Sequence, residues 1–253
     1  MSLPSPVGGA SFQTSSAVTS LLNQYYYPTV GNFVVLFLQF SAAVTGLTVF
    51  NGATGGTVLT PGPVINNMYS FYGIASNTGS FYYWSASWTG SAYLGMTIEE
   101  YNLAKAATGF SPTNYATASG TSGTASISLT TDDAAGNLIV CGFGNASNNA
   151  FTATVGTERQ QSTTYTARCQ LLDNSNVSPG SLSCTSTLTS SAWDAIALEL
   201  RFTVAAVPGF GGVTPRTLLQ GLAKATVLQP LANNPTGPTP PSHGQGFPTG
   251  QQT

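Results

Sequence analysis

Few residues of this sequence have side chains suited to acid–base, nucleophilic or metal chemistry. The chain has a single histidine, His243, which lies in a Pro- and Gly-rich stretch near its end. A Ser–His–Asp or Cys–His arrangement would have to recruit that residue, and a metal site built from His and Cys meets the same obstacle. The sequence therefore predicts no catalytic residue, no cofactor and no metal, and the protein is expected not to be an enzyme.

The eight acidic residues form no evident catalytic pair. Glu99 and Glu100 are adjacent, and in a strand they would point to opposite faces of the sheet. A short helix over residues 97–107 is the alternative for this stretch. Asp132 and Asp133 precede AAGN, where a turn bonded by Asp and Asn side chains is favoured over calcium binding, because calcium takes six or more oxygens.

The stretch with the composition of a binding site is the aromatic run FYYWSASW, residues 81–88. Tyr82, Trp84 and Trp88 share one face of the strand that this run predicts. Sugar-binding modules use exposed Trp and Tyr rings as flat platforms, whereas aromatic residues also dominate cores and subunit interfaces. Burial in a core or an interface is the favoured interpretation, and contact with a sugar or another partner is the alternative.

Charge is scarce in this chain. Only 6% of its 253 residues are charged and the net charge is −2, against about 25% charged residues in ordinary soluble domains. The six Lys and Arg residues are scattered, so no basic stripe for nucleic acid is expected. The longest apolar run, Phe33–Leu38, is too short to cross a membrane. The opening MSLPSPVGGASFQ predicts no signal peptide, so export would follow another route or occur within a particle.

The three cysteines leave at least one thiol unpaired. Cys141 lies in an apolar run and is expected to be a buried thiol. Cys169 and Cys184 are expected on neighbouring strands. Two reduced thiols there are favoured over a disulfide bridge, because the cysteine spacing is not that of a disulfide framework.

The strand pattern is clearest in residues 190–204, SSAWDAIALELRFTV. Ile196, Leu198 and Leu200 fall on one face, together with Asp194, which is expected to contact a turn amide. Phe33–Phe40 and Leu138–Phe143 are apolar at both alternating positions, as in central strands covered on both faces. About ten such strands, separated by turn sequences, predict an all-β, jelly-roll-like antiparallel β-sandwich with extended N- and C-terminal arms.

Composition divides the chain into three parts. Residues 1–18 are expected to form an N-terminal arm, residues 19–204 the β-sandwich domain and residues 205–253 a Pro/Gly-rich C-terminal assembly tail. Within the domain, residues 106–124 are expected to form a long loop of small residues. The tail is expected to lie along a neighbouring subunit and to bury its leucines there, namely Leu218, Leu219, Leu222, Leu228 and Leu231.

Three segments in this order carry a resemblance to a known group of domains: SFYYWSASWTGSAYLGMTIEEYN (residues 80–102), GNLIVCGFG (residues 136–144) and SSAWDAIALELR (residues 190–201). The chain resembles, over residues 25–202, the jelly-roll β-sandwich domains of bacterial surface proteins and phage virion proteins. The resemblance implies a fold and carries no catalytic motif.

The expected function that follows is a non-enzymatic structural protein of a virion, either a tailed-phage capsid decoration protein or a tail component, held in the assembly by its arms. Its expected partners are copies of itself and other virion subunits, without nucleic acid or membrane. The alternatives are an extracellular carbohydrate-binding or adhesion module, with a glycan bound at Tyr82, Trp84 and Trp88, and a subunit of an extracellular filament.

Overall fold

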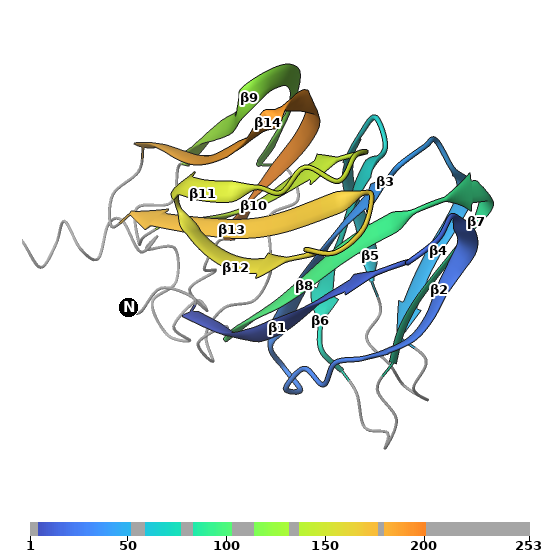
Figure 1. The fold of residues 1–253 in the computed structure, drawn as a ribbon. Helices are drawn as coiled ribbons and strands as arrows, with labels where there is room; N and C mark the ends of the chain where they lie inside the picture. The colour runs from blue at the N-terminus through green and yellow to red at the C-terminus, as the bar shows by residue number, and fades with distance from the viewer. Residues whose placement is uncertain are drawn as a thin grey trace, which may run out of the picture. The chain divides into compact units, whose positions relative to one another are not determined.

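The structure is a computed structural model, and it describes residues 5–51, 59–76, 83–102, 114–131, 137–176 and 180–200. Over these ranges the regular structure consists of fourteen strands, arranged in three antiparallel sheets (Figure 1). The predicted all-β class and antiparallel sandwich architecture are confirmed, with more strands than the ten expected. The jelly-roll connectivity stays a prediction.

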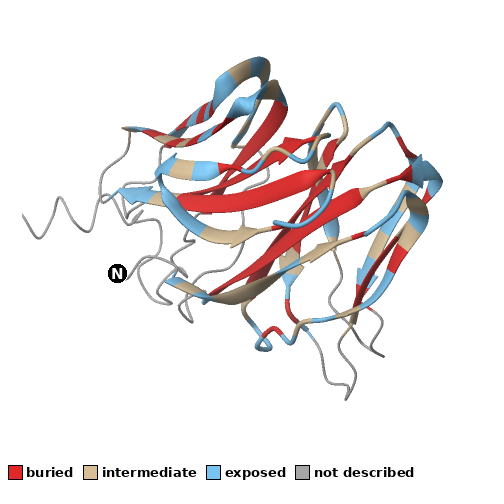
Figure 2. Cartoon of the chain, viewed as in Figure 1, coloured by how far each residue is buried: buried red, intermediate tan, exposed pale blue. Residues whose placement is uncertain are grey.

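The middle layer is a five-stranded sheet, hereafter the middle sheet. Its strand order is β1 (Ser5–Gln13), β8 (Leu94–Asn102), β3 (Phe33–Phe40), β6 (Met68–Ile74) and β5 (Thr60–Ile65). Every residue of β3 is buried, as its run of apolar residues at both alternating positions predicts (Figure 2).

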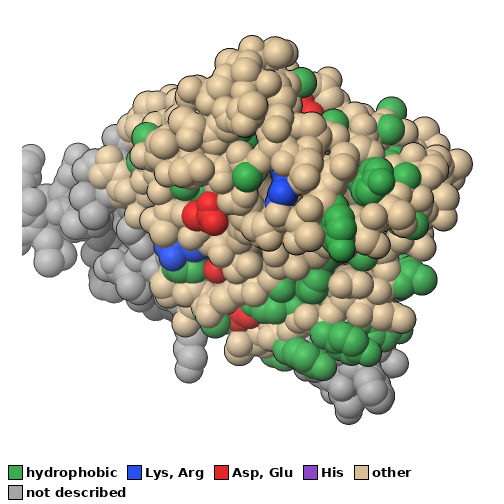
Figure 3. Space-filling model, viewed as in Figure 1, with side chains coloured by type: hydrophobic (Ala, Val, Ile, Leu, Met, Phe, Trp, Pro, Cys, Tyr) green, Lys and Arg blue, Asp and Glu red, His purple; other side chains and the backbone are tan. Residues whose placement is uncertain are grey.

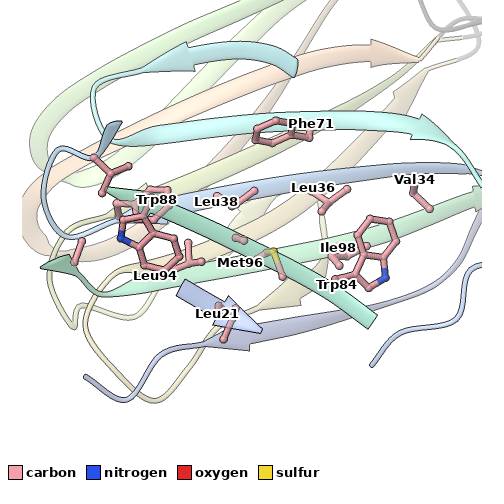
Figure 4. Packing of buried hydrophobic residues seen from close by; sticks show 14 residues of the cluster. Leu21, Val34, Leu36, Leu38, Phe71, Trp84, Trp88, Leu94, Met96 and Ile98 are labelled. Atoms are coloured by element: carbon pink, nitrogen blue, oxygen red, sulfur yellow. The ribbon is translucent and has the colours of Figure 1, made fainter. Parts of the chain in front are cut away.

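A three-stranded sheet, hereafter the small sheet, covers one face of the middle sheet. It contains β2 (Val18–Tyr25), β7 (Tyr83–Ala92) and β4 (Thr45–Asn51), with β7 in the centre. The core between the two sheets contains Leu36 and Leu38 from β3, Ile98 from β8, and the two tryptophans of β7, Trp84 and Trp88 (Figure 4). The face of β7 that carries Trp84 and Trp88 is therefore an inner face.

A six-stranded sheet, hereafter the large sheet, lies against the other face of the middle sheet. It contains β12 (Thr157–Gln161), β13 (Arg168–Asn176), β10 (Asn137–Asn145), β14 (Gly180–Leu200) and β11 (Thr152–Val155), and β9 (Tyr115–Thr131) pairs with β14. The core between the large and middle sheets contains Val35 and Phe37 of β3 together with Val140, Ile196 and Leu198. Gly142 lets the sheets approach, because a Cβ there would lie 2.4 Å from the Phe37 ring.

The long strands β9 and β14 give the large sheet a third core. Their register is interrupted between Thr187 and Ser191. On one side of this interruption, residues 180–187 of β14 pair with residues 124–131 of β9. Ile127 and Leu182 lie in this paired portion. They pack with Ile139, Cys141 and other residues on the face of β10 that is turned away from the middle sheet. Residues 193–200 of β14 are consequently buried on both faces, with Ile196, Leu198 and Leu200 in one core, and Trp193, Ala195 and Ala197 in the other.

Two expectations from the sequence are wrong. Residues 5–13, expected within the N-terminal arm and outside the sandwich, form β1, which pairs with β8 from Ser5↔Asn102 to Gln13↔Gly95. The described part of the expected loop, from Asn114 onward, lies almost wholly in β9, whose small residues alternate along a ladder with β14. For residues 97–107 the strand is confirmed over the described part, Thr97–Asn102, which belongs to β8, and the helical alternative is not adopted there.

The domain boundary expected after residue 204 stays a prediction. The contacts within the chain divide it into Met1–Ala205 and Ala206–Thr253, and every described residue belongs to the first unit. The tail leucines, Leu218, Leu219, Leu222, Leu228 and Leu231, lie outside the described residues, as do Asp132 and Asp133.

Candidate interaction site

The aromatic residues singled out in the sequence do not form a surface site. Trp84 has no exposed area, and its Nε1 donates to the carbonyl oxygen of Tyr26 at 3.1 Å. Trp88 is buried against Phe40, with ring centroids 5.0 Å apart and planes at 70°. Tyr82 lies outside the described residues. For both tryptophans the structure shows the core position that the sequence favoured, and neither offers a flat ring to a sugar.

The opposite face of the same small sheet carries aromatic side chains at the surface. Tyr83 precedes Trp84 in β7, so its side chain lies on the opposite face of the sheet. Its partner across the ladder is Tyr25 of β2. On the other side of β7, Phe50 of β4 is paired with Ser85, two residues from Tyr83. Such directly opposite and diagonal neighbours on one sheet face lie about 5–8 Å apart. Tyr25, Phe50 and Tyr83 therefore share one surface, hereafter the outer aromatic face.

Exposure confirms that this face is turned away from the core. Tyr25 is 63% exposed and Phe50 is 43% exposed, whereas Tyr83 is half-buried. Leu22, which lies in the irregular part of β2 between Leu21 and Gln24, is also exposed. The sequence signal was available in FYYWSASW: the large tryptophans alternate with Tyr83, Ser85 and Ser87, and a polar alternate set marks the outer face.

The remainder of this face is polar and uncharged. The hydroxyls of Thr48 and Ser87 lie 2.7 Å apart across the β4–β7 ladder. Ser85 is buried under the β2 irregularity, and its hydroxyl accepts from the Asn23 backbone N–H at 3.1 Å. A surface of aromatic rings and paired hydroxyls, without a charged group in these strands, costs little to desolvate.

The loop after β2 extends the outer aromatic face. Tyr27 is 59% exposed and Val30 is similarly exposed. The loop is held from below by Glu100, whose carboxylate accepts from the Tyr26 hydroxyl at 2.9 Å, from the Thr29 backbone N–H at 3.0 Å and from the Asn32 side-chain amide. Burial, together with the hydrogen bond to Glu100, raises the pKa of Tyr26 far above its ordinary range, so its hydroxyl keeps its proton.

Two further contacts fix the loop. The Tyr26 hydroxyl lies 2.7 Å from the Gly8 carbonyl oxygen of β1, and the backbone N–H of Gly31 donates to Ala75 at 2.7 Å. Gly31 has φ of +88°, a conformation that only glycine adopts freely. The exposed apolar residues of this loop are thus presented by a fixed backbone. Figure 3 shows hydrophobic side chains gathered over the lower right of the view, where β1 and β2 lie in Figure 1.

The buried carboxylates between the middle and large sheets have structural partners. Asp173 of β13 accepts from Arg159 Nε at 2.8 Å and from the Tyr101 hydroxyl of β8 at 3.2 Å. Glu99, which precedes Tyr101 by two residues in β8, accepts from Gln160 Nε2 of β12 at 3.0 Å. Burial raises the pKa of Glu99 and of Tyr101 above their usual values. These groups join β8 to β12 and β13.

The remaining described acids are also hydrogen-bond acceptors within the fold. Asp194 accepts from the side-chain amide of Asn66 at 2.7 Å, and Asn66 lies in the turn between β5 and β6. The expected contact of Asp194 with a turn amide is confirmed. Glu199 accepts from Asn114, and Glu158 accepts from Gln161 at 3.0 Å. Glu99 and Glu100 lie on opposite faces of β8, as their adjacency predicted for a strand.

All three cysteines are free and buried, so the expectation for Cys141 is confirmed. The favoured expectation that Cys169 and Cys184 are reduced thiols is also confirmed, but their expected placement on neighbouring strands is wrong, because β10 lies between β13 and β14. Cys169 lies in the core between the large and middle sheets, whereas Cys184 lies in the core on the other face of the large sheet, beside Cys141. Adjacent residues of a strand point to opposite faces, and this alternation puts the layer of the large sheet between the two thiols.

Neither a metal centre nor a membrane-spanning helix is found in the parts of the chain that the structure describes. No three His, Cys, Asp or Glu side chains among those residues are grouped as they would be to hold a metal ion. No helix there is long and apolar enough to cross a membrane. Comparison of the chain with models of protein families, with curated proteins and with solved structures gives no match.

Proposed function

We propose that this chain is a non-enzymatic structural protein of a virion, a capsid decoration protein or tail component, and that it docks on neighbouring subunits through the outer aromatic face. The observation that carries the proposal is the set of exposed apolar side chains on and beside the small sheet: Leu22, Tyr25, Tyr27, Val30 and Phe50. Aromatic residues of this kind are enriched at protein–protein interfaces, where charged residues are depleted.

The distribution of polar groups supports the same proposal. Each described carboxylate accepts a hydrogen bond from another part of the same chain, so the acids serve the fold, and the outer face of the small sheet is left with hydroxyls and rings. The mixture of aliphatic and aromatic side chains favours a protein partner over a sugar, because Leu22 and Val30 have no ring to stack on a pyranose. The resemblance to virion sandwich domains directs the proposal to a virion.

The test is incorporation of surface variants into particles. Tyr25→Ser and Phe50→Ser are introduced together in the gene of the full-length chain, and Tyr115→Ser on β9 serves as the matched control, since Tyr115 is also about half exposed. Particles are purified, and the number of copies of the chain per particle is measured by quantitative mass spectrometry. Removing two anchoring rings is expected to lower incorporation about tenfold or more, at unchanged stability of the isolated protein. Equal incorporation of the double variant and the control would refute the proposed docking face.

A further inference from the structure

A small hollow lies between β1 and the loop that joins β12 to β13, and none of its lining residues belongs to the outer aromatic face. It is about 230 Å³ in volume and is lined by Ser11, Phe12 and Gln13 on one side and by residues 162–165 on the other. Pockets for drug-sized ligands are roughly 300–1,000 Å³. The hollow therefore suits one small ring, with the rest of a longer ligand remaining in solvent.

The hollow is held in shape by the side chain of Gln13. Its Nε2 donates to the carbonyl oxygens of Tyr165 at 2.6 Å and Thr166 at 3.1 Å, and its Oε1 accepts from the backbone N–H groups of Thr164 at 3.1 Å and Tyr165 at 2.9 Å. The side-chain amide of Gln13 thus makes hydrogen bonds to the loop backbone of the kind that a neighbouring strand would make. A site fixed before binding avoids the cost of ordering a loop when the ligand arrives.

The base of the loop is fixed as well. The Ser162 hydroxyl accepts from the Cys169 backbone N–H at 2.8 Å, and the Ser162 carbonyl oxygen accepts from Arg168 Nη1 at 3.1 Å. Gly95 of β8 passes directly beneath, since a Cβ at that position would lie 2.8 Å from the Ser162 hydroxyl. These contacts leave Thr163, Thr164 and Tyr165 exposed at the rim of a rigid turn.

The chemistry of the lining selects the ligand. Ser11, Thr163 and Thr164 are among the lining residues, and a hydroxyl can both donate and accept a hydrogen bond. Tyr165 is 41% exposed and supplies an aromatic surface beside them. None of the seven lining residues carries a charge. A ligand that fits must be small, uncharged, rich in hydroxyls and partly apolar.

We propose that this hollow binds one residue of an uncharged glycan, a hexopyranose or an N-acetylhexosamine. The apolar face of the pyranose ring packs on Tyr165, and its hydroxyls exchange hydrogen bonds with Ser11, Thr163 and Thr164. The site differs from the aromatic strand that the sequence offered for sugar binding, because Trp84 and Trp88 are buried in the core. The proposal is independent of the proposed virion function, since it uses none of the residues of the outer aromatic face.

Saturation-transfer NMR on the full-length protein tests the site. The probes are the methyl glycosides of glucose, galactose and mannose, and of N-acetylglucosamine and N-acetylgalactosamine, at millimolar concentration, with N-acetylneuraminic acid as a charged comparison. At least one neutral probe is expected to receive saturation. Tyr165→Ala is expected to weaken its binding about two- to tenfold, the contribution of one aromatic contact. The control Tyr27→Ala removes another exposed tyrosine, which does not line the hollow, and is expected to leave binding unchanged.

A second variant tests the contribution of a rim hydroxyl separately from that of the Tyr165 ring. Thr163→Val keeps the shape of the rim and removes one hydroxyl, so it is expected to weaken binding without a change in the melting temperature. Failure of every neutral probe to receive saturation would overturn the proposal. So would transfer to the acidic sugar alone, or transfer to a neutral probe that Tyr165→Ala and Thr163→Val leave at the wild-type level.

Discussion

Removal of the Glu100 carboxylate should loosen the loop that carries Tyr27 and Val30. In the folded protein this carboxylate accepts from the Thr29 backbone N–H, the Asn32 amide and the Tyr26 hydroxyl, and it is almost fully buried. Glu100→Ala leaves the first two donors without a partner, while the Tyr26 hydroxyl keeps the Gly8 carbonyl oxygen. Each unsatisfied buried donor costs about 1–3 kcal/mol. The two donors together cost about 2–6 kcal/mol, and because water reaches this exposed loop more easily than a core, we expect a loss in the lower half of that range, about 3 kcal/mol.

Glu100→Gln is the matched variant. Its amide oxygen can still accept from Thr29 and Asn32, and its NH₂ group can donate to the Tyr26 hydroxyl, which then donates to Gly8. We therefore expect Glu100→Gln to lose less than half as much stability as Glu100→Ala. At about 2–4 °C per kcal/mol for a domain of this size, Glu100→Ala should lower the melting temperature by about 6–12 °C.

The assay is thermal unfolding followed by circular dichroism, together with amide hydrogen exchange of the native protein. In Glu100→Ala, the amide of Gly31, which donates to the Ala75 carbonyl oxygen, should exchange faster than in the wild type. The amides of β10 should still exchange only through global unfolding, so their opening free energy should fall by no more than the loss of global stability. Equal melting temperatures for the wild type and Glu100→Ala would refute the role given to this carboxylate. Equal losses in the Ala and Gln variants would show that hydrogen bonding is not its basis.

Three further predictions concern the core. Burial raises the pKa of Glu99 in the folded state, because it penalises the ionised carboxylate. Glu99→Gln should therefore be more stable than the wild type at neutral pH. Urea unfolding should show that this difference in stability vanishes as the pH falls below the carboxyl pKa of the unfolded chain, about 4.3. Gly142→Ala places a Cβ within 2.4 Å of the Phe37 ring and 2.6 Å of Met68 Cε, so it should cost about 1–3 kcal/mol in the same assay, and a neutral effect would contradict the close approach of the two sheets. Cys169 is fully buried, which raises the pKa of its thiol to about 12, so a thiol reagent should label it only in denaturant, and rapid labelling of the native protein would be evidence against its burial.

The central strands were predictable from sequence because both alternating sets of β3 are apolar, a pattern that burial on both faces requires. Strand β9 was missed because Ala, Ser, Thr and Gly dominate it and resemble a loop in composition. Exposed residues alternate with less exposed ones along β9 because the strand pairs with the distant β14, and local sequence does not reveal such a partner.

Strand β1 was missed for a related reason. Its Pro6, Gly8 and Gly9 are typical of an arm. In the fold, a Cβ at Gly9 would lie 2.2 Å from both Glu99 Oε2 and the Ile98 carbonyl oxygen, so the small residue is what allows β1 to lie against β8. A fragment limited to residues 19–204 would lack this strand and expose the edge of β8, so the folded unit has to include residues from Ser5 onward.

The candidate site was located only in part. The sequence pointed to strand β7, but to Trp84 and Trp88 on its inner face. Which alternate set of β7 is exposed follows from its place between β2 and β4 and from the packing of Trp84 and Trp88 on the middle sheet. The contribution of Tyr25 and Phe50 depends on the two ladders that put them beside β7, and these residues are separated from Tyr83 by 58 and 33 positions in the chain.

The most direct test of the proposed virion role is the composition of purified particles after a salt wash. Contacts through rings and hydroxyls, in a chain with 6% charged residues, depend little on screening by salt, whereas adventitious electrostatic adsorption is lost. Particles are banded by density gradient, washed in molar salt and measured by quantitative mass spectrometry. We predict that the chain bands with the particle at a fixed copy number and survives the wash. Its absence from the particle band, or its loss in the wash, would contradict the proposed role.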